Sequence, residues 1–178
     1  MTLPYPDPRL RGRTFDLRPF READFELATA FGSDPETELW VPPLPAADAA
    51  GVVERFERYR VDGELLHLVV ADRATDAYLG EVMVMMGEHR VGEFGCGFVP
   101  PARGRGLATE ALRLFLVWSV PALDIRRCQV LVGQGNEPAL RLAERVGFRR
   151  EGVLRSYWDH DGDRLDVTML SMLPGEVA

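Results

Sequence analysis

The sequence contains no lysine, and all 21 of its basic residues are arginines. This absence excludes mechanisms that need a lysine amine, both Schiff-base chemistry and the phosphate-binding lysine of a P-loop. Cysteine is also scarce, and Cys96 and Cys128 each lie in an apolar, strand-like context. Two such thiols are typical of reduced core residues rather than of a disulfide or a metal pair, so we expect no redox role.

The sequence also lacks an ordered set of metal ligands. Its three histidines, His67, His89 and His160, are scattered without ligand spacing. Residues 159–166, DHDGDRLD, resemble a calcium loop, but glycine stands fourth rather than sixth and no glutamate follows at the twelfth position. We therefore expect a hairpin turn at Asp161 and Gly162, and no metal.

Long apolar runs are absent as well. No stretch approaches the roughly 18 apolar residues of a membrane-spanning helix, and the first residues lack the apolar core of a signal peptide. We expect a cytoplasmic protein that does not enter a membrane. The 178 residues, 46% of them hydrophobic, are enough for one domain with a sizeable core, which we assign to residues 1–178.

The formal charge of −7 and the pI of about 5.0 are unfavourable for a general nucleic-acid binder. A phosphate polymer would be repelled over most of such a surface. The charge favours a small cationic partner instead.

The hydrophobic pattern predicts alternating strands and helices without a repeat or a linker. A first strand (residues 14–20) is followed by helices at 21–31 and 46–61, with a loop between them. A meander of strands follows at 65–72, 77–86 and 93–99, then a helix at 106–120 that Pro121 stops. A strand at 128–132, a helix from an Asn136 cap to Gly147, and strands at 148–158 and 163–173 complete the order β-α-α-β-β-β-α-β-α-β-β.

Two arginines and two glycines stand between a predicted strand and a predicted helix in PPARGRGLATEAL, residues 100–112. A helix N-terminus binds phosphate where the chain can approach closely, and Gly104 and Gly106 permit that approach. Arg103 and Arg105 add charged donors that suit a diphosphate. The alternative is a glycine turn with solvated arginines.

Two other phosphate-binding motifs fit less well. The P-loop requires G-x-x-x-x-G-K-[S/T], which does not occur in this sequence. The dinucleotide fingerprint G-x-G-x-x-G/A would place Thr109 at its third small position and Asp124 before the next strand rather than at its end. The preceding strands also form a meander rather than a βαβ unit.

The segment Arg103-Gly104-Arg105-Gly106-Leu107-Ala108 resembles the R/Q-x-x-G-x-G/A pyrophosphate loop of the GNAT superfamily of acyl-CoA-dependent N-acyltransferases. Residues 129–155 resemble the second cofactor segment of this family, with Asn136 and the Gly147-Phe148 pair in place. Residues 12–25 and 163–173 are similar to the ends of its RimJ/RimL-type branch. The resemblance covers about residues 12–173.

The resemblance implies an α+β (mixed α/β) fold: a twisted mixed sheet of about seven strands, splayed between the fourth and fifth, with about four helices. CoA would lie in the gap, its pantetheine amides paired with the backbone of Phe98 and Val99. Its diphosphate would meet the N–H groups of residues 105–109, which include Leu107, Ala108 and Thr109. Asn136 would cap its helix, bond the pantetheine, or do both.

The implied reaction transfers an acetyl group from acetyl-CoA to an amine, which attacks directly in a ternary complex. The backbone N–H of Val99 would stabilise the thioester carbonyl, and Glu93 would serve as general base, directly or through water; otherwise Glu93 is an exposed carboxylate at a strand end. By resemblance, RimJ/RimL-type enzymes usually carry a serine at the position of Ala139, and other GNAT branches carry a tyrosine at the position of Ala143. Neither alanine can donate a proton, so the general acid is unassigned. A thiol with a pKa near about 8.5 leaves as thiolate at a cost of only about 2 kcal/mol at pH 7.

The expected partners are therefore acetyl-CoA and a cationic amine acceptor, either an N-terminal α-amine of a protein or a small primary amine. Nucleic acid is not expected, and a homodimer is left open. Residues 33–40, SDPETELW, and the pair Tyr157-Trp158 could frame the acceptor with acids and rings, or belong to solvated loops. The acids expected to attract a cationic acceptor are Asp34, Glu36 and Glu38 in the first long loop and Asp159, Asp161 and Asp163 in the last turn. The competing hypothesis is a CoA sensor or interaction module without catalysis.

Overall fold

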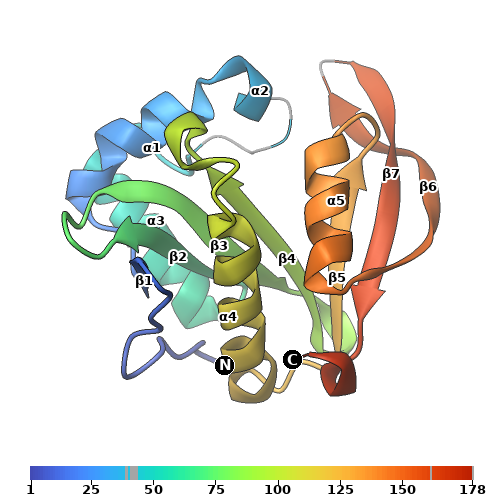
Figure 1. Cartoon of the computed structure of the whole chain (residues 1–178), viewed down its shortest axis with the longest axis horizontal. Helices are drawn as coiled ribbons and strands as arrows, with labels where there is room; N and C mark the ends of the chain where they lie inside the picture. Colours follow the sequence, from blue (N-terminus) through green and yellow to red (C-terminus); the bar gives the residue numbers. More distant parts are fainter. Residues whose placement is uncertain (39, 41–43, 161, 178) are drawn as a thin grey trace.

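The computed structural model describes residues 1–38, 40, 44–160 and 162–177. Its centre is a seven-stranded mixed sheet with the strand order β1-β2-β3-β4-β5-β7-β6 (Figure 1). The strands are β1 Phe15–Arg18, β2 Leu65–Asp72, β3 Tyr78–Met86, β4 Val91–Phe98, β5 Arg127–Gly133, β6 Arg149–His160 and β7 Asp163–Met172. All neighbouring strands are antiparallel except β4 and β5, which are parallel.

The sheet opens between β4 and β5. These strands pair only where Val91–Glu93 faces Arg127–Gln129. Beyond that point β4 continues beside β3 up to Phe98, and β5 continues beside β7 up to Gly133. The expected splay between the fourth and fifth strands is therefore confirmed, and the free edges of both strands face a gap (Figure 1).

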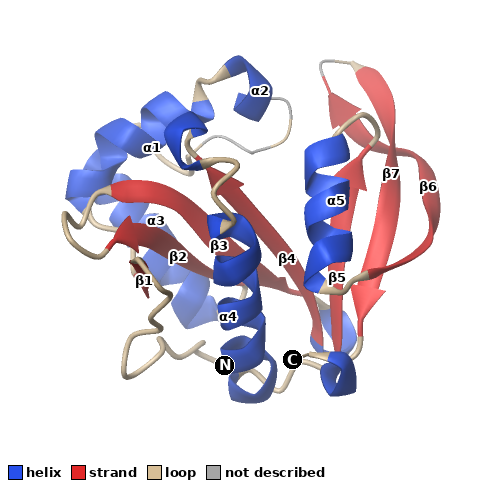
Figure 2. Ribbon diagram, in the orientation of Figure 1, coloured by secondary structure: helices blue, strands red, loops and turns tan. Residues whose placement is uncertain are grey.

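Helices cover both faces of the sheet (Figure 2). They are α1 Phe25–Gly32, α2 Pro35–Glu38, α3 Ala49–Asp62, α4 Leu107–Ala122 and α5 Glu137–Val146, with short 3₁₀ turns η1 Glu22–Asp24, η2 Glu88–Arg90, η3 Pro100–Ala102 and η4 Pro174–Glu176. The four longer helices confirm the predicted order, whereas α2 lies in a segment predicted as loop. Among the helices described, none is long and apolar enough to cross a bilayer.

Two apolar cores explain why the central strands have little polar alternation. In β2, Leu66, Leu68 and Val70 belong to the core under α4 and α5. Val69 and Ala71 belong to the core under α1 and α3 on the opposite face. A strand that is buried on both faces is apolar at successive positions.

One predicted boundary is wrong and another is confirmed. Helix α4 does not stop at Pro121 but includes it in its last turn and continues to Ala122. Proline there removes one N–H donor, and the helix closes beyond it because the Leu123 N–H donates to the Ser119 carbonyl at 2.8 Å. Helix α5 begins as predicted, where Asn136 Oδ1 accepts from the Ala139 N–H at 3.1 Å.

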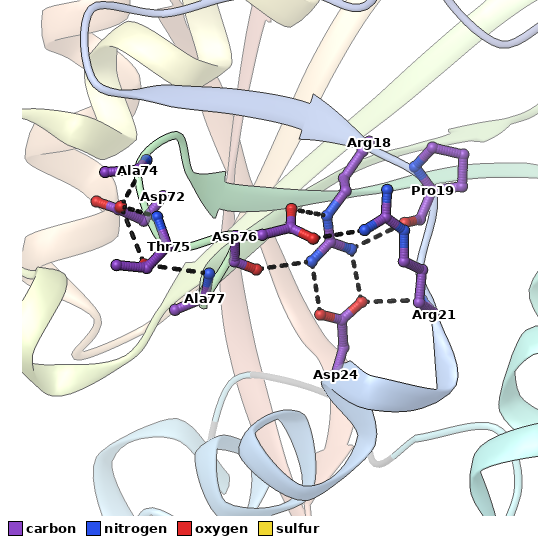
Figure 3. Close-up of polar contacts among 9 residues, drawn as sticks. All are labelled: Arg18, Pro19, Arg21, Asp24, Asp72, Ala74, Thr75, Asp76 and Ala77. Carbon is purple, nitrogen blue, oxygen red and sulfur yellow. Dashed lines mark hydrogen bonds and ion pairs between the residues drawn. The ribbon is translucent and has the colours of Figure 1, made fainter.

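A buried ion pair connects β1 to η1 and to the turn between β2 and β3 (Figure 3). Arg18, 2% exposed, donates from Nη1 and Nη2 to the two carboxylate oxygens of Asp24 in η1, at 2.7 and 2.8 Å. Its Nε donates to Asp76, in the turn between β2 and β3, at 2.8 Å. Since each of these groups is hydrogen-bonded, the cluster fixes the position from which α1 starts.

Candidate active site

Two cavities meet at the gap between β4 and β5. The larger, about 610 Å³, lies on the side of α4 and α5. The smaller, about 240 Å³, extends past the β4 edge to side chains on the face that carries α1 and α3. Trp40, Cys96, Asn136, Ala139 and Leu142 line both. The shared residues show that the two cavities adjoin at the gap.

Residues 103–106, called the glycine loop below, form one wall of the larger cavity. Gly104 and Gly106 have φ angles of 71° and 78°, which favour glycine, and a Cβ on either would enter open space. Gly106 is the N-cap of α4, so the first-turn N–H groups that follow it have no acceptor within the helix. The cavity is lined by most of the residues expected to bind the cofactor: Phe98, Arg103, Gly104, Gly106, Leu107, Ala108, Thr109 and Asn136. Arg105 is exposed beside them.

Arg103 makes contacts that the sequence did not indicate. Its Nε donates to the Phe98 carbonyl at 2.8 Å. Its Nη2 donates to the Asp34 carboxylate at 3.0 Å and to the Thr37 hydroxyl at 2.8 Å. The guanidinium therefore connects the end of β4 to Asp34 before α2 and to Thr37 within α2, besides lining the cavity.

The backbone of β4 corrects one expectation. The Val99 N–H donates to the Leu79 carbonyl at 3.1 Å, so it faces β3 and is already bonded. Since N–H groups alternate in direction along an antiparallel strand, those of Phe98 and Cys96 face the gap instead. The Val99 N–H, expected to face a thioester carbonyl, is therefore already bonded within the sheet, whereas the N–H of Phe98 faces the gap.

Glu93 lies at the closed end of the gap and lines the smaller cavity. It is in the last residue pair between β4 and β5, and its Oε2 accepts from Gln129 Nε2 at 3.0 Å. Ala139 and Ala143, at the positions where the family resemblance led us to expect a serine or a tyrosine, also line this cavity. The wall therefore has a carboxylate but no hydroxyl at these two positions.

A second carboxylate, Glu81 of β3, borders the smaller cavity and was missed in the sequence. Its Oε2 accepts from the Tyr78 hydroxyl at 3.0 Å and pairs with His67 Nε2 at 2.9 Å. Burial opposes the charged form, but the His67 partner and these hydrogen bonds hold the pKa of Glu81 below its ordinary value. The signal was one polar residue inside each of two neighbouring apolar strands, His67 in β2 and Glu81 in β3.

Two tryptophans converge on the end of β5. A Cβ placed on Gly133 would lie 2.6 Å from a ring atom of Trp40 and 2.9 Å from one of Trp158. Trp40 follows α2, whereas Trp158 comes from β6 on the other side of the gap. Both line the smaller cavity, so aromatic walls and two carboxylates surround the same space.

The comparison with protein families identifies the chain. Residues 15–149 match the model of the acetyltransferase (GNAT) domain. The chain belongs to the GNAT acetyltransferase family. The uncharacterized N-acetyltransferase p20 of Bacillus licheniformis is 26% identical over 167 residues, which cover 91% of this chain and 94% of that protein.

Solved acetyltransferase structures share the fold. The ribosomal-protein-S5-alanine acetyltransferase of Vibrio fischeri has a TM-score of 0.80 at 17% identity, covering 96% of this chain and 98% of that one. The spermidine N-acetyltransferase of Vibrio cholerae, in complex with CoA and spermine, has a TM-score of 0.79 at 22% identity, covering 93% and 99%. This GNAT domain is therefore an acetyltransferase, and the two cavities are its candidate active site.

Proposed function

We propose that this GNAT enzyme transfers an acetyl group from acetyl-CoA to a primary amine by direct attack in a ternary complex. The observation that carries the proposal is the pair of cavities that meet at the β4–β5 gap. One offers backbone N–H groups and the other offers carboxylates. A donor and an acceptor can thus approach from opposite faces of the sheet and react between them.

The larger cavity fits the donor. The open space beside Gly104 and Gly106 gives a diphosphate access to the first turn of α4. The N–H groups of that turn have no acceptor within the helix, and the helix end has a partial positive charge. The free edge of β4 can pair with amides of the pantetheine arm. Asn136 uses Oδ1 for its cap, which leaves its Nδ2 to donate to the arm.

The N–H of Phe98 takes the role first expected of Val99. It faces the gap, where a thioester carbonyl would gain negative charge during attack. Hydrogen-bond donors fixed in advance at that point lower the barrier without reorganisation. The donor is a backbone group, so it does not depend on the side chain.

Direct attack is favoured over a covalent acetyl-cysteine. Cys96 lines both cavities, but burial raises the pKa of its thiol to about 12, and the negative charge of Glu81 adds to the rise. The thiol therefore stays protonated near neutral pH and is a weak nucleophile. The attacking group is then the amine itself.

The amine must lose a proton, and Glu93 is the proposed acceptor, directly or through water. Its Oε1 has no hydrogen-bond partner in the part of the chain that the structure describes, while Gln129 holds Oε2. Glu81 is the weaker candidate because two donors already stabilise its charge. The thiolate needs no dedicated side-chain acid, since it leaves at a cost of only about 2 kcal/mol.

The proposed acceptor is a cationic primary amine, because the smaller cavity combines Glu81 and Glu93 with the rings of Trp40 and Trp158. Asp34 and Glu38 belong to the segment that precedes Trp40, and Asp159 and Asp163 to the ends of β6 and β7 that follow Trp158. The Glu36 side chain and Asp161 lie outside the described residues. Two structurally similar proteins are named as acetyltransferases of a ribosomal protein and of spermidine, so peptides and polyamines are the first acceptors to test.

A thiol-release assay with acetyl-CoA tests the proposal. The acceptor panel holds peptides beginning with Ser, Thr or Ala, polyamines and aminoglycosides. We expect amine-dependent release of CoA, with the acetylated product confirmed by mass spectrometry. Tight CoA binding without release over the whole panel would instead support a non-catalytic CoA-binding module.

A further inference from the structure

A depression on the surface continues from the larger cavity past the glycine loop. It is about 540 Å³ and shares Gly106, Thr109 and Arg145 with that cavity. It adds Arg13, Glu110 and Arg113. The glycine loop therefore separates the gap on one side from a group of arginines on the other.

These three arginines come from three separate parts of the chain: the segment before β1, helix α4 and the end of helix α5. All three are exposed. The depression has one carboxylate, Glu110, against three guanidinium groups, although the whole chain has a formal charge of −7. The local positive charge is thus opposite in sign to that of the protein.

The arginines are also held in place. The Arg13 backbone N–H and Nε donate to the two oxygens of Glu110 at 2.6 and 3.0 Å. Arg113 Nη2 donates to the Arg145 carbonyl at 2.5 Å, which ties α4 to the end of α5. Neither the Nη atoms of Arg13 nor the guanidinium of Arg145 has an acceptor among the residues described, so these groups remain available to an anion.

We propose that Arg13, Arg113 and Arg145 bind the 3′-phosphate of CoA. The inference rests on the proposed function, which places the thioester at the gap and the diphosphate on the glycine loop. The nucleotide lies beyond the diphosphate in CoA, and the depression lies beyond the loop in the protein. A phosphomonoester carries up to two negative charges, and several guanidinium groups match it in charge and in hydrogen bonds.

Glu110 has a positioning role in this site. Burial opposes its charged form, but the hydrogen bonds and charge of Arg13 hold the pKa of Glu110 below its ordinary value. Since it stays ionised at neutral pH, it keeps Arg13 over the depression at the cost of some repulsion toward a phosphate. The net attraction of this site for a phosphate therefore depends on Arg113 and Arg145 as well as on Arg13.

Calorimetric titration with CoA and with 3′-dephospho-CoA tests the proposal. We expect the wild-type protein to bind CoA about tenfold more tightly or better, as one charge-assisted contact or more would give. Arg13→Gln, Arg113→Gln and Arg145→Gln should each reduce this preference by weakening CoA binding alone. Arg58→Gln, an exposed arginine of α3 on the opposite face, should leave both affinities unchanged.

The binding of dephospho-CoA by each variant reports whether that variant is folded. Equal affinity of the wild-type protein for the two ligands would overturn the proposal, as would a preference that all three substitutions leave unchanged. If neither ligand binds to the wild-type protein, the proposed acetyltransferase function itself fails, which is a different outcome.

Discussion

At the scale of single residues, Gly106 has two separate properties: a left-handed backbone, with φ of 78°, and open space where a Cβ would be. Gly106→Val should cost about 1–2 kcal/mol of stability for the strained backbone. It should also place a branched side chain where the diphosphate needs to approach, weakening CoA binding more than about tenfold.

Gly162→Val is the matched control, because Gly162 has a φ of 87° and also meets open space, but lies in the turn between β6 and β7. Calorimetry for CoA and thermal unfolding should show a similar loss of stability for both variants and a loss of binding for Gly106→Val alone. Normal CoA binding by a folded Gly106→Val protein would remove the loop from the donor site.

The two carboxylates of the smaller cavity should respond differently to substitution. Glu93→Gln should lower kcat about 100-fold or more, the range of a lost general base, with little change in the KM for acetyl-CoA. Glu81→Gln removes the charge paired with His67 and should mainly lower the melting temperature. Measuring kcat against pH for both variants separates the roles, and the assignment to Glu93 is wrong if only Glu81→Gln abolishes the pH dependence.

The site residues that could be predicted from the sequence belong to local motifs, whereas those that could not depend on contacts between distant segments. Glycines and arginines before a helix form a local pattern, so Gly106 could be placed from its neighbours alone. The direction of the Val99 N–H depends on its pairing with Leu79, and the contact of Glu81 with His67 depends on the register of β2 and β3. Such register is set by the folded sheet and is not encoded within any one strand.

At the scale of elements, the Arg18 cluster holds β1, η1 and the β2–β3 turn together (Figure 3). Asp24→Asn leaves the buried Arg18 charge without its bidentate partner and should lower the free energy of unfolding by about 3–5 kcal/mol. Arg141→Met breaks the exposed pair with Glu137 on α5 and should change stability by less than about 1 kcal/mol. Urea denaturation of both variants checks the contrast, which fails if the two changes are equal.

On the other side of the gap, Glu151 of β6 joins three strands through Arg127 of β5 and Ser171 of β7. The hydrogen bonds from Arg127 and then Ser171 lower the pKa of Glu151 to about 2, from an ordinary 4.5. Because the folded-state pKa is the lower one, the stabilisation is complete above about pH 4.5 and is lost as the pH falls toward 2.

Glu151→Gln should therefore lower the melting temperature at neutral pH and flatten its fall below pH 4.5. Glu54→Gln, which changes an exposed carboxylate on α3, should keep the wild-type pH profile. Melting temperatures recorded between pH 2 and 7 decide the matter. A Glu151→Gln curve parallel to the wild-type curve throughout would show that the Arg127 contact is too well solvated to matter.

At the scale of the whole molecule, charge is divided between the two ends of the candidate active site. The nucleotide end has Arg13, Arg113 and Arg145. At the other end, α2 and the adjoining ends of β6 and β7 stand on either side of the open gap and contain the acids Glu38, Asp159 and Asp163 (Figure 1). Together with the net charge of −7, these acids should attract a cationic acceptor before contact.

If this field guides the acceptor, the KM of a diamine should rise with added salt more than that of a monoamine of similar size, since screening acts on each charge. Glu38→Gln combined with Asp163→Asn should raise the diamine KM at low salt and reduce its salt dependence, with little effect on kcat. A charge that steers encounter contributes to binding before and during the reaction alike, so it changes KM rather than the chemical step. Initial rates at about 0.02 and 0.5 M ionic strength test this, because the Debye length shortens severalfold over that range. Identical diamine and monoamine responses, unchanged in the double variant, would leave recognition of the acceptor to Trp40, Trp158 and the carboxylates inside the cavity.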